Sequence, residues 1–203
     1  MVPTTNNSTR DVVEGALAEA ADALKGLRAD ATALHSIAAA ADMLAEAFKS
    51  GNRAYACGNG GSMCDAMHFA EELSGRFRDD RPALPAQAIS DPGHLSCVAN
   101  DFGYDRVFAR YVEAHGAAND VLLAISTSGN SQNVVSAAAE AKNKGLRVIA
   151  LVGRIGSPLA KLADVTIATP GGQYADRVQE LHIKVIHILI EAVERSLFNS
   201  NDG

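Results

Sequence analysis

A histidine and a glutamate stand one helical turn apart in the segment MHFAEEL, residues 67–73. Because His68 and Glu72 are four residues apart, their side chains would cover the same patch of a helix. An imidazole beside a carboxylate can act as an acid–base pair or supply two ligands to a divalent metal ion. The same spacing is common in plain surface pairs and in hydrogen-bonded core pairs, so this segment alone leaves all of these interpretations open.

A second histidine lies near the end of the chain, in the segment ADRVQELHIKVIH, residues 175–187. At about 100° per residue, His187 returns close to the helix face that begins with Asp176, whereas His182 points well away from it. A lone histidine in such an apolar stretch is typical of the core, but the histidine–glutamate pair elsewhere in the chain favours a joint site. Two imidazoles, a carboxylate and an amide oxygen suit zinc or a similar divalent ion. These candidate ligands are His68, Glu72, Gln179 and His187.

The segment STSGNS, residues 126–131, joins an apolar run to a helical one and contains four hydroxyl side chains. Hydroxyls and the free N–H groups of a helix start can converge on a phosphate, and Gly129 lets the backbone turn closely around it. Turn and capping residues have similar compositions, but four hydroxyls exceed what capping requires. We therefore predict a phosphate site here. The segment GNGG, residues 58–61, is weaker evidence because it lacks the complete dinucleotide-binding spacing.

These segments alternate with short apolar runs that are typical of buried strands. Strands that alternate with helices indicate right-handed crossovers and a parallel sheet covered on both faces. In such a sheet, ligands bind beyond the carboxyl ends of the strands, where the candidate loops lie. We predict an α/β fold, a five-stranded doubly wound, flavodoxin-like sheet. The expected strands are residues 53–57, 86–90, 121–125, 147–152 and 165–168.

The ends of the chain add helices to this sheet. Residues 11–50 are rich in Ala and Leu and fit two helices broken near residues 26–30. A long apolar helix is expected at about residues 174–198, buried and in contact with another subunit. We predict a polar tail at residues 1–10 and one domain over residues 11–203.

Composition excludes several classes of protein. The formal net charge of −6 argues against general nucleic-acid binding, and no apolar run approaches the length of a membrane span. The three cysteines lack C-x-x-C spacing, so we expect buried free thiols and a cytoplasmic protein.

Four segments of the sequence resemble the phosphoheptose isomerases of the sugar isomerase (SIS) superfamily. The resemblance covers about residues 51–194. The segments are GNGGSMCDAMHFAEELSGRF, AISDPGHLSCVANDFGYDRVFARYVE, DVLLAISTSGNSQNVVSAAAEAKNKGLRVIALVG and YADRVQELHIKVIHILIE.

The resemblance implies a homotetramer with active sites at subunit interfaces and the conversion of sedoheptulose 7-phosphate to D-glycero-D-manno-heptose 7-phosphate. It implies zinc held by His68, Glu72, Gln179 and His187, with Glu72 and His187 as catalytic base and acid. It also implies a set of positions that contact the sugar phosphate. These are Asn59, Gly60, Gly61, Glu72, Asn100, Asp101, Ser126, Thr127, Ser128, Ser131, Asp176 and Gln179.

The expected reaction is an aldose–ketose isomerisation through an enediol, in which a carboxylate moves a proton between neighbouring carbons. A carboxylate held by zinc is a weaker base, so either Glu72 exchanges between the two roles or another group assists it. The alternative function is a non-catalytic module that binds a sugar phosphate or regulates replication. Relatives of that kind have lost the glutamate and the second histidine, whereas this chain has Glu72 and His187.

Overall fold

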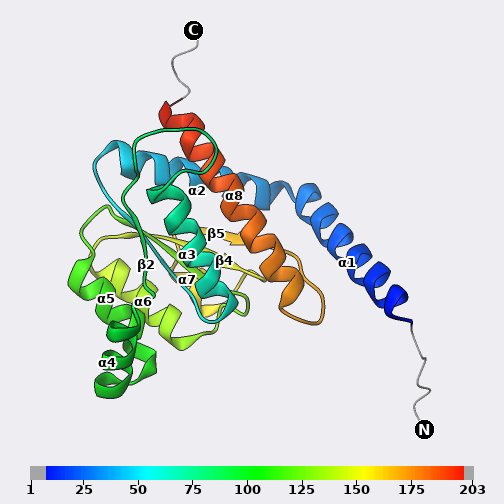
Figure 1. Cartoon of the computed structure of the whole chain (residues 1–203). Helices are drawn as coiled ribbons and strands as arrows, with labels where there is room; N and C mark the ends of the chain where they lie inside the picture. Colours follow the sequence, from blue (N-terminus) through cyan, green and yellow to red (C-terminus); the bar gives the residue numbers. More distant parts are fainter. Residues whose placement is uncertain (1–7, 199–203) are drawn as a thin grey trace.

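The computed structural model describes residues 8–198, and its centre is a sheet of five parallel strands in the order β2-β1-β3-β4-β5 (Figure 1). The predicted fold class is confirmed. The first seven residues of the predicted tail lie outside the described residues. The strands are β1 (Ala54–Cys57), β2 (Ala86–Ala88), β3 (Val121–Ser126), β4 (Arg147–Val152) and β5 (Val165–Ala168).

Helices cover both faces of the sheet, and the strands bury side chains on each. In β3, Leu123 and Ile125 face one hydrophobic core cluster. This cluster is formed with the second N-terminal helix, the helix that follows β1 and the last helix of the chain. Leu122 and Ala124 face the opposite cluster, under the helices that follow β2 and β3. Strands buried on both faces read as continuous apolar runs, which is why they are evident in the sequence. The helices are α1 (Thr9–Ala29), α2 (Ala31–Lys49), α3 (Gly61–Ser74), α4 (Pro92–Phe102), α5 (Val107–His115), α6 (Gln132–Asn143), α7 (Pro158–Leu162) and α8 (Asp176–Phe198).

The N-terminal helices break at a single residue. Asp30 is the N-cap of α2, and its carboxylate accepts hydrogen bonds from the backbone N–H groups of Thr32 and Ala33 at 2.9 and 3.0 Å. The helix α1 begins at Thr9, two residues before the expected start, and extends away from the sheet (Figure 1). Its exposed side chains include Val12, Val13 and Leu17.

The strand order creates a switch point between β1 and β3. From β1 the chain moves to β2 on one side, and β3 then pairs with β1 on the other side. The loops that follow β1 and β3 therefore lie next to each other beyond the carboxyl ends of the strands, where ligands bind in open α/β sheets.

The cysteines are free, as expected, but only Cys57 is buried. Cys64 and Cys97 are exposed, because they lie on the outward faces of α3 and α4. The expectation of three buried thiols was therefore wrong for two of them. Within residues 8–198, no helix combines the length and the apolar character that crossing a membrane requires.

Candidate active site

The helices α3 and α8 lie side by side and run in the same direction, so they meet at successive levels. At the start of α3, the amide of Gln179 occupies the space beside Gly61, where an added Cβ would stand 2.8 Å from Nε2. Two turns further along both helices, His68 meets His187. This register, in which Gly61 leaves room for the Gln179 amide, brings the two predicted half-sites together.

Three of the four predicted metal ligands form one compact group, which we call the histidine–glutamate cluster (His68, Glu72 and His187). Their ligand atoms all lie within 4.8 Å of one another. His68 Nε2 is 2.8 Å from His187 Nε2 and 3.5 Å from Glu72 Oε1. The fourth predicted ligand, Gln179, contacts Gly61, and its part in the cluster stays a prediction.

Glu71 lies beside the first imidazole of the cluster. Its Oε1 lies 3.1 Å from His68 Nδ1 on the side away from His187. When Nδ1–H donates to this carboxylate, Nε2 presents its lone pair to the cluster, which is the arrangement found in many metal-binding histidines. Sequence reasoning missed Glu71, although its three-residue spacing from His68 is a visible signal.

The environment of His187 favours a neutral ring. Burial lowers the pKa of His187, and the neighbouring His68 lowers it further, whereas Glu72 acts in the opposite direction. The Phe77 ring lies beside His187, with the ring centroids 5.6 Å apart. A neutral imidazole can bind a metal ion, so this environment suits the ligand role predicted for His187.

The donor set of the cluster fits a zinc ion. Ligand atoms about 2.1 Å from a tetrahedral zinc ion lie about 3.4 Å from one another. The separations of 2.8 and 3.5 Å between the donor atoms of His68 and its two partners are on either side of this value. Two imidazole nitrogens and a carboxylate oxygen are also ligands that zinc prefers.

A further carboxyl group lies one turn before His68 and was not predicted. Asp65 is half-buried, and its Oδ2 has no hydrogen-bond partner among the described residues. Burial raises the pKa of Asp65 to about 6, although His68 acts to lower it. An acid–base group next to the cluster thus titrates close to neutral pH.

The loop between β3 and α6 forms the second part of the site, and we call residues 126–131 the hydroxyl loop. Ser126 Oγ and Ser131 Oγ are 3.1 Å apart, and the Gly129 N–H donates to Ser126 Oγ at 3.1 Å. Gly129 has a φ of +66°, and a Cβ there would meet Ser157 Oγ at 2.2 Å. Only glycine fits this turn, both because of its backbone conformation and because of the lack of space.

The hydroxyls of this loop are not used up by helix capping. Ser131 precedes α6, but within the described chain its side chain makes no capping hydrogen bond. Thr127 and Ser128 line a cavity of about 290 Å³ together with Arg154, which follows β4. Hydroxyls, free N–H groups at the start of α6 and a nearby cation are the donors that an anion requires. Arg154 was missed because it comes from another strand.

Asn59, on the loop after β1, is hydrogen-bonded to α6, the helix that follows the hydroxyl loop. Its side-chain amide exchanges two hydrogen bonds of 2.8 Å with the buried amide of Asn133 on α6, and Tyr104 Oη donates to it at 3.2 Å. Gly60, the next residue, has a φ of +54° and begins the turn into α3. The loop after β1 is thus joined to the helix that follows the hydroxyl loop. Asn133 and Tyr104 were not predicted.

The remaining predicted substrate positions lie at the surface. Asn100 and Asp101 are exposed at the end of α4, where the amide of Asn100 donates to Asp101 at 2.7 Å. Asp176 is exposed at the start of α8 and lies 3.4 Å from the guanidinium of Arg177. Their contacts with substrate stay predictions.

His182, which its helical angle directs away from the face of His187, lies in the core. It is fully buried, and neither ring nitrogen has a hydrogen-bond partner in the part of the chain that the structure describes. Burial lowers the pKa of His182 to about 4, with a smaller opposing effect from the Val152 backbone. It is therefore a neutral structural group at neutral pH.

Comparisons with known proteins agree with this architecture. A family model for the SIS domain matches residues 17–153. A phosphoheptose isomerase of Pectobacterium atrosepticum is 57% identical over 188 residues, which are 93% of this chain and 97% of the relative. One of Vibrio cholerae is 55% identical over 93% of this chain and 98% of the relative.

Solved structures show the same relationship. The phosphoheptose isomerase GmhA from Neisseria gonorrhoeae matches with a TM-score of 0.85 and 36% identity, over 92% of this chain and 99% of that chain. A phosphoheptose isomerase from Francisella tularensis matches with a TM-score of 0.87 and 32% identity, over 93% of this chain and 100% of that chain. The chain therefore belongs to the SIS domain family and, within it, to the phosphoheptose isomerases.

Proposed function

We propose that this protein is an aldose–ketose isomerase that converts sedoheptulose 7-phosphate to D-glycero-D-manno-heptose 7-phosphate for heptose biosynthesis. The observation that carries the proposal is the histidine–glutamate cluster, in which residues from two distant segments of the chain converge. The relatives at 55% and 57% identity are named phosphoheptose isomerases, which supports the same substrate for this chain.

The cluster supplies the groups that the reaction needs. An aldose and its ketose differ by the transfer of one proton between neighbouring carbons and one between their oxygens. We assign the carbon proton to Glu72, whose carboxylate is mostly shielded, with 18% of its side chain exposed. His187 transfers the proton on oxygen from the opposite helix, because its lowered pKa makes the neutral ring available.

The hydroxyl loop anchors the other end of the substrate. Thr127, Ser128 and Ser131 would donate to the phosphate, and Ser126 supports the turn through its hydrogen bond from Gly129. Binding energy at the phosphate positions the reacting carbons at the cluster, which raises the rate of proton transfer. We assign the sugar hydroxyls to the other predicted positions, which are Asn59, Gly60, Gly61, Asn100, Asp101, Asp176 and Gln179.

We propose that zinc is the metal of this site and that His68, Glu72, Gln179 and His187 hold it. The convergence of His68, Glu72 and His187 supports this assignment for three of the four ligands. When bound, a divalent ion would stabilise negative charge that develops on the substrate oxygens.

We further propose a cytoplasmic homotetramer with active sites at subunit interfaces. The exposed apolar side chains of α1, among them Val12, Val13 and Leu17, support an interface because a neighbouring subunit would cover them. The three free cysteines support a reducing compartment. We also propose a polar tail at residues 1–10 and one SIS domain over residues 11–203, because the strands and helices of the sequence form a single alternating pattern. The non-catalytic alternative is not favoured, since the compared relatives are named as isomerases.

The test is an assay of purified protein with sedoheptulose 7-phosphate, before and after treatment with a chelator and after zinc is restored. We expect turnover that falls on chelation and returns with zinc. Binding of the sugar phosphate without any conversion, in the presence of zinc, would instead establish the non-catalytic alternative.

A further inference from the structure

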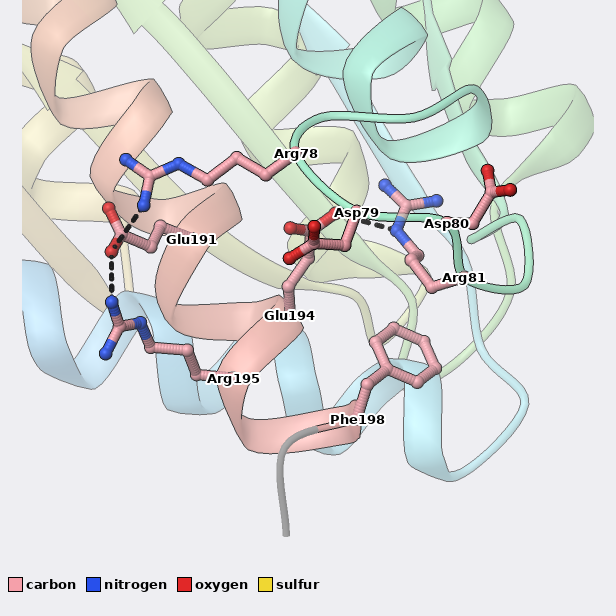
Figure 2. A pocket seen from close by; sticks show the side chains of 8 residues that line it. All are labelled: Arg78, Asp79, Asp80, Arg81, Glu191, Glu194, Arg195 and Phe198. Carbon is pink, nitrogen blue, oxygen red and sulfur yellow. Dashed lines mark hydrogen bonds and ion pairs between the residues drawn. The ribbon is translucent and has the colours of Figure 1, made fainter. Parts of the chain in front are cut away.

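An arginine on the loop after α3 is buried at the end of that helix. Only 4% of the Arg81 side chain is exposed, and its guanidinium has acceptors on every side. It donates to the carbonyl oxygens of Glu72 at 2.7 Å, Leu73 at 2.8 Å and Gly75 at 3.0 Å. Its Nε donates to Glu194 Oε1 at 2.8 Å (Figure 2).

These contacts hold the last turn of α3, which carries Glu72. The final carbonyl groups of a helix have no partner within the helix, and helix ends fray unless another group binds them. Arg81 binds two of these carbonyl groups, one of which belongs to Glu72 itself. A cation at this end also interacts favourably with the helix dipole. The backbone position of Glu72 is therefore fixed by the Arg81 guanidinium.

Glu194 connects this turn to the second helix of the site. It lies on α8, seven residues or about two turns beyond His187. The Arg81–Glu194 pair is thus a third level of contact between α3 and α8, after the Gln179–Gly61 and His68–His187 contacts. It is placed to set the separation between the helix that carries Glu72 and the helix that carries His187.

A neighbouring ion pair, which is more exposed, joins the same loop to the same helix. Arg78 pairs with Glu191 at 2.8 Å, and Glu191 also pairs with Arg195 at 2.7 Å (Figure 2). The Arg78 side chain is 55% exposed, so this pair is screened by solvent. The structure thus contains an exposed pair that serves as a natural control for the buried one.

We propose that Arg81 and Glu194 are positioning residues, which hold Glu72 at the distance from His187 that proton transfer and metal binding require. The inference rests on the proposed function of the histidine–glutamate cluster. A buried ion pair is a poor source of stability because of its desolvation cost, but it fixes geometry when all its hydrogen bonds are made. Arg81 meets that condition through five acceptors, which are the Glu194 carboxylate and the carbonyl groups of Glu72, Leu73, Gly75 and Pro82.

The experiment compares Glu194→Gln and the double variant Arg81→Met/Glu194→Met with the wild-type protein. The double variant leaves no unpaired buried charge, and Glu194→Gln preserves shape and folding if the double variant does not fold. We measure kcat, KM for sedoheptulose 7-phosphate, and zinc affinity by competition with a chelator. We expect the double variant to lose about 10- to 100-fold in kcat and about 10-fold in zinc affinity, with KM changed less than about threefold. Glu194→Gln should lose about fivefold in kcat.

Two controls separate positioning from loss of stability. Glu191→Gln breaks both exposed ion pairs on α8 and should leave kcat and zinc affinity unchanged. Val112→Ala removes buried volume from α5 on the opposite face of the sheet and should lower the melting temperature without lowering kcat. Arg81→Lys, which can satisfy only some of the five acceptors, should have a kcat between those of the wild type and the double variant.

Wild-type kcat and zinc affinity in both Glu194→Gln and a folded double variant would overturn the positioning role. An equal loss of kcat in Val112→Ala would also overturn it, because the effect would then follow stability. A wild-type protein that neither converts the substrate nor binds zinc would contradict the proposed function itself, which is a distinct outcome.

Discussion

The hydroxyl loop takes its four hydroxyls from six consecutive residues, whereas the histidine–glutamate cluster joins histidines that are 119 residues apart in sequence. The loop depends on one local turn, in which Gly129 allows the backbone to double back. The cluster depends on the packing of α3 against α8. Changes in the loop should therefore weaken binding of the phosphate, while changes in the cluster should slow the chemistry.

The largest effect is expected in the cluster. Glu72→Gln keeps the size of the side chain but removes the base, so kcat should fall about 10³-fold with little change in KM. Steady-state kinetics with sedoheptulose 7-phosphate measure both constants. Glu71→Gln is the matched comparison, because Glu71 only orients His68, and its kcat should fall about 10-fold. Full activity in Glu72→Gln would remove this residue from the reaction.

The next effect tests whether the loop depends on its turn. Gly129→Ala should lower the free energy of unfolding by about 3 kcal/mol and raise KM at least about 10-fold, because the left-handed backbone is strained and the new Cβ meets Ser157. Denaturant unfolding and steady-state kinetics measure these changes. Gly156→Ala has the same kind of backbone, with a φ of +81°, but open space around it. It should cost only about 1 kcal/mol, and equal losses in both variants would argue against the close contact.

The buried His182 of α8 makes stability depend on pH. His182 has a folded pKa of about 4 against an ordinary value of 6.5. As the pH falls below 6.5, the unfolded state binds a proton that the folded state does not, so stability is lost with decreasing pH. The wild type should lose about 2 kcal/mol more than His182→Leu between pH 7 and pH 5. Denaturant unfolding at both pH values measures this difference, and parallel losses would show that His182 is protonated in the folded protein.

The smallest effect concerns one hydroxyl of the loop. Thr127→Val removes a donor to the phosphate and should raise KM about 10-fold, with kcat nearly unchanged. Thr166→Val is a matched control, because its hydroxyl bonds to the Ala160 carbonyl away from the loop. Steady-state kinetics of the two variants test the assignment. A fall in kcat without a change in KM for Thr127→Val would place this residue with the chemistry instead.

The comparison also explains what the sequence could predict. The hydroxyl loop and the buried strands are contiguous, so composition and periodicity reveal them. The cluster was reached through helical spacing of His68 and Glu72 and through the resemblance to a family, since periodicity alone gives no register between α3 and α8. That register depends on close contacts such as Gly61 with Gln179, which appear only in the folded chain.

The residues that sequence reasoning missed act through long-range contacts. Arg154 and Asn133 contact the site from other elements of the fold. Arg81 binds backbone carbonyl groups, which every residue has, so no residue type in the sequence indicates this contact. Asp65 was missed for another reason, because burial rather than sequence raises its pKa to about 6. Cys64 and Cys97 show the converse error, since a residue type that is usually buried lies here on exposed helix faces.

The most direct test of the account is the conversion of sedoheptulose 7-phosphate by the zinc-loaded protein in D₂O, followed by NMR. Proton transfer by Glu72 through an enediol predicts that the aldose product forms and that a fraction of it carries deuterium on the carbon next to its carbonyl, the rest having received the proton that Glu72 removed. A substrate that stays unchanged, or a product that forms at the wild-type rate in Glu72→Gln, would contradict it.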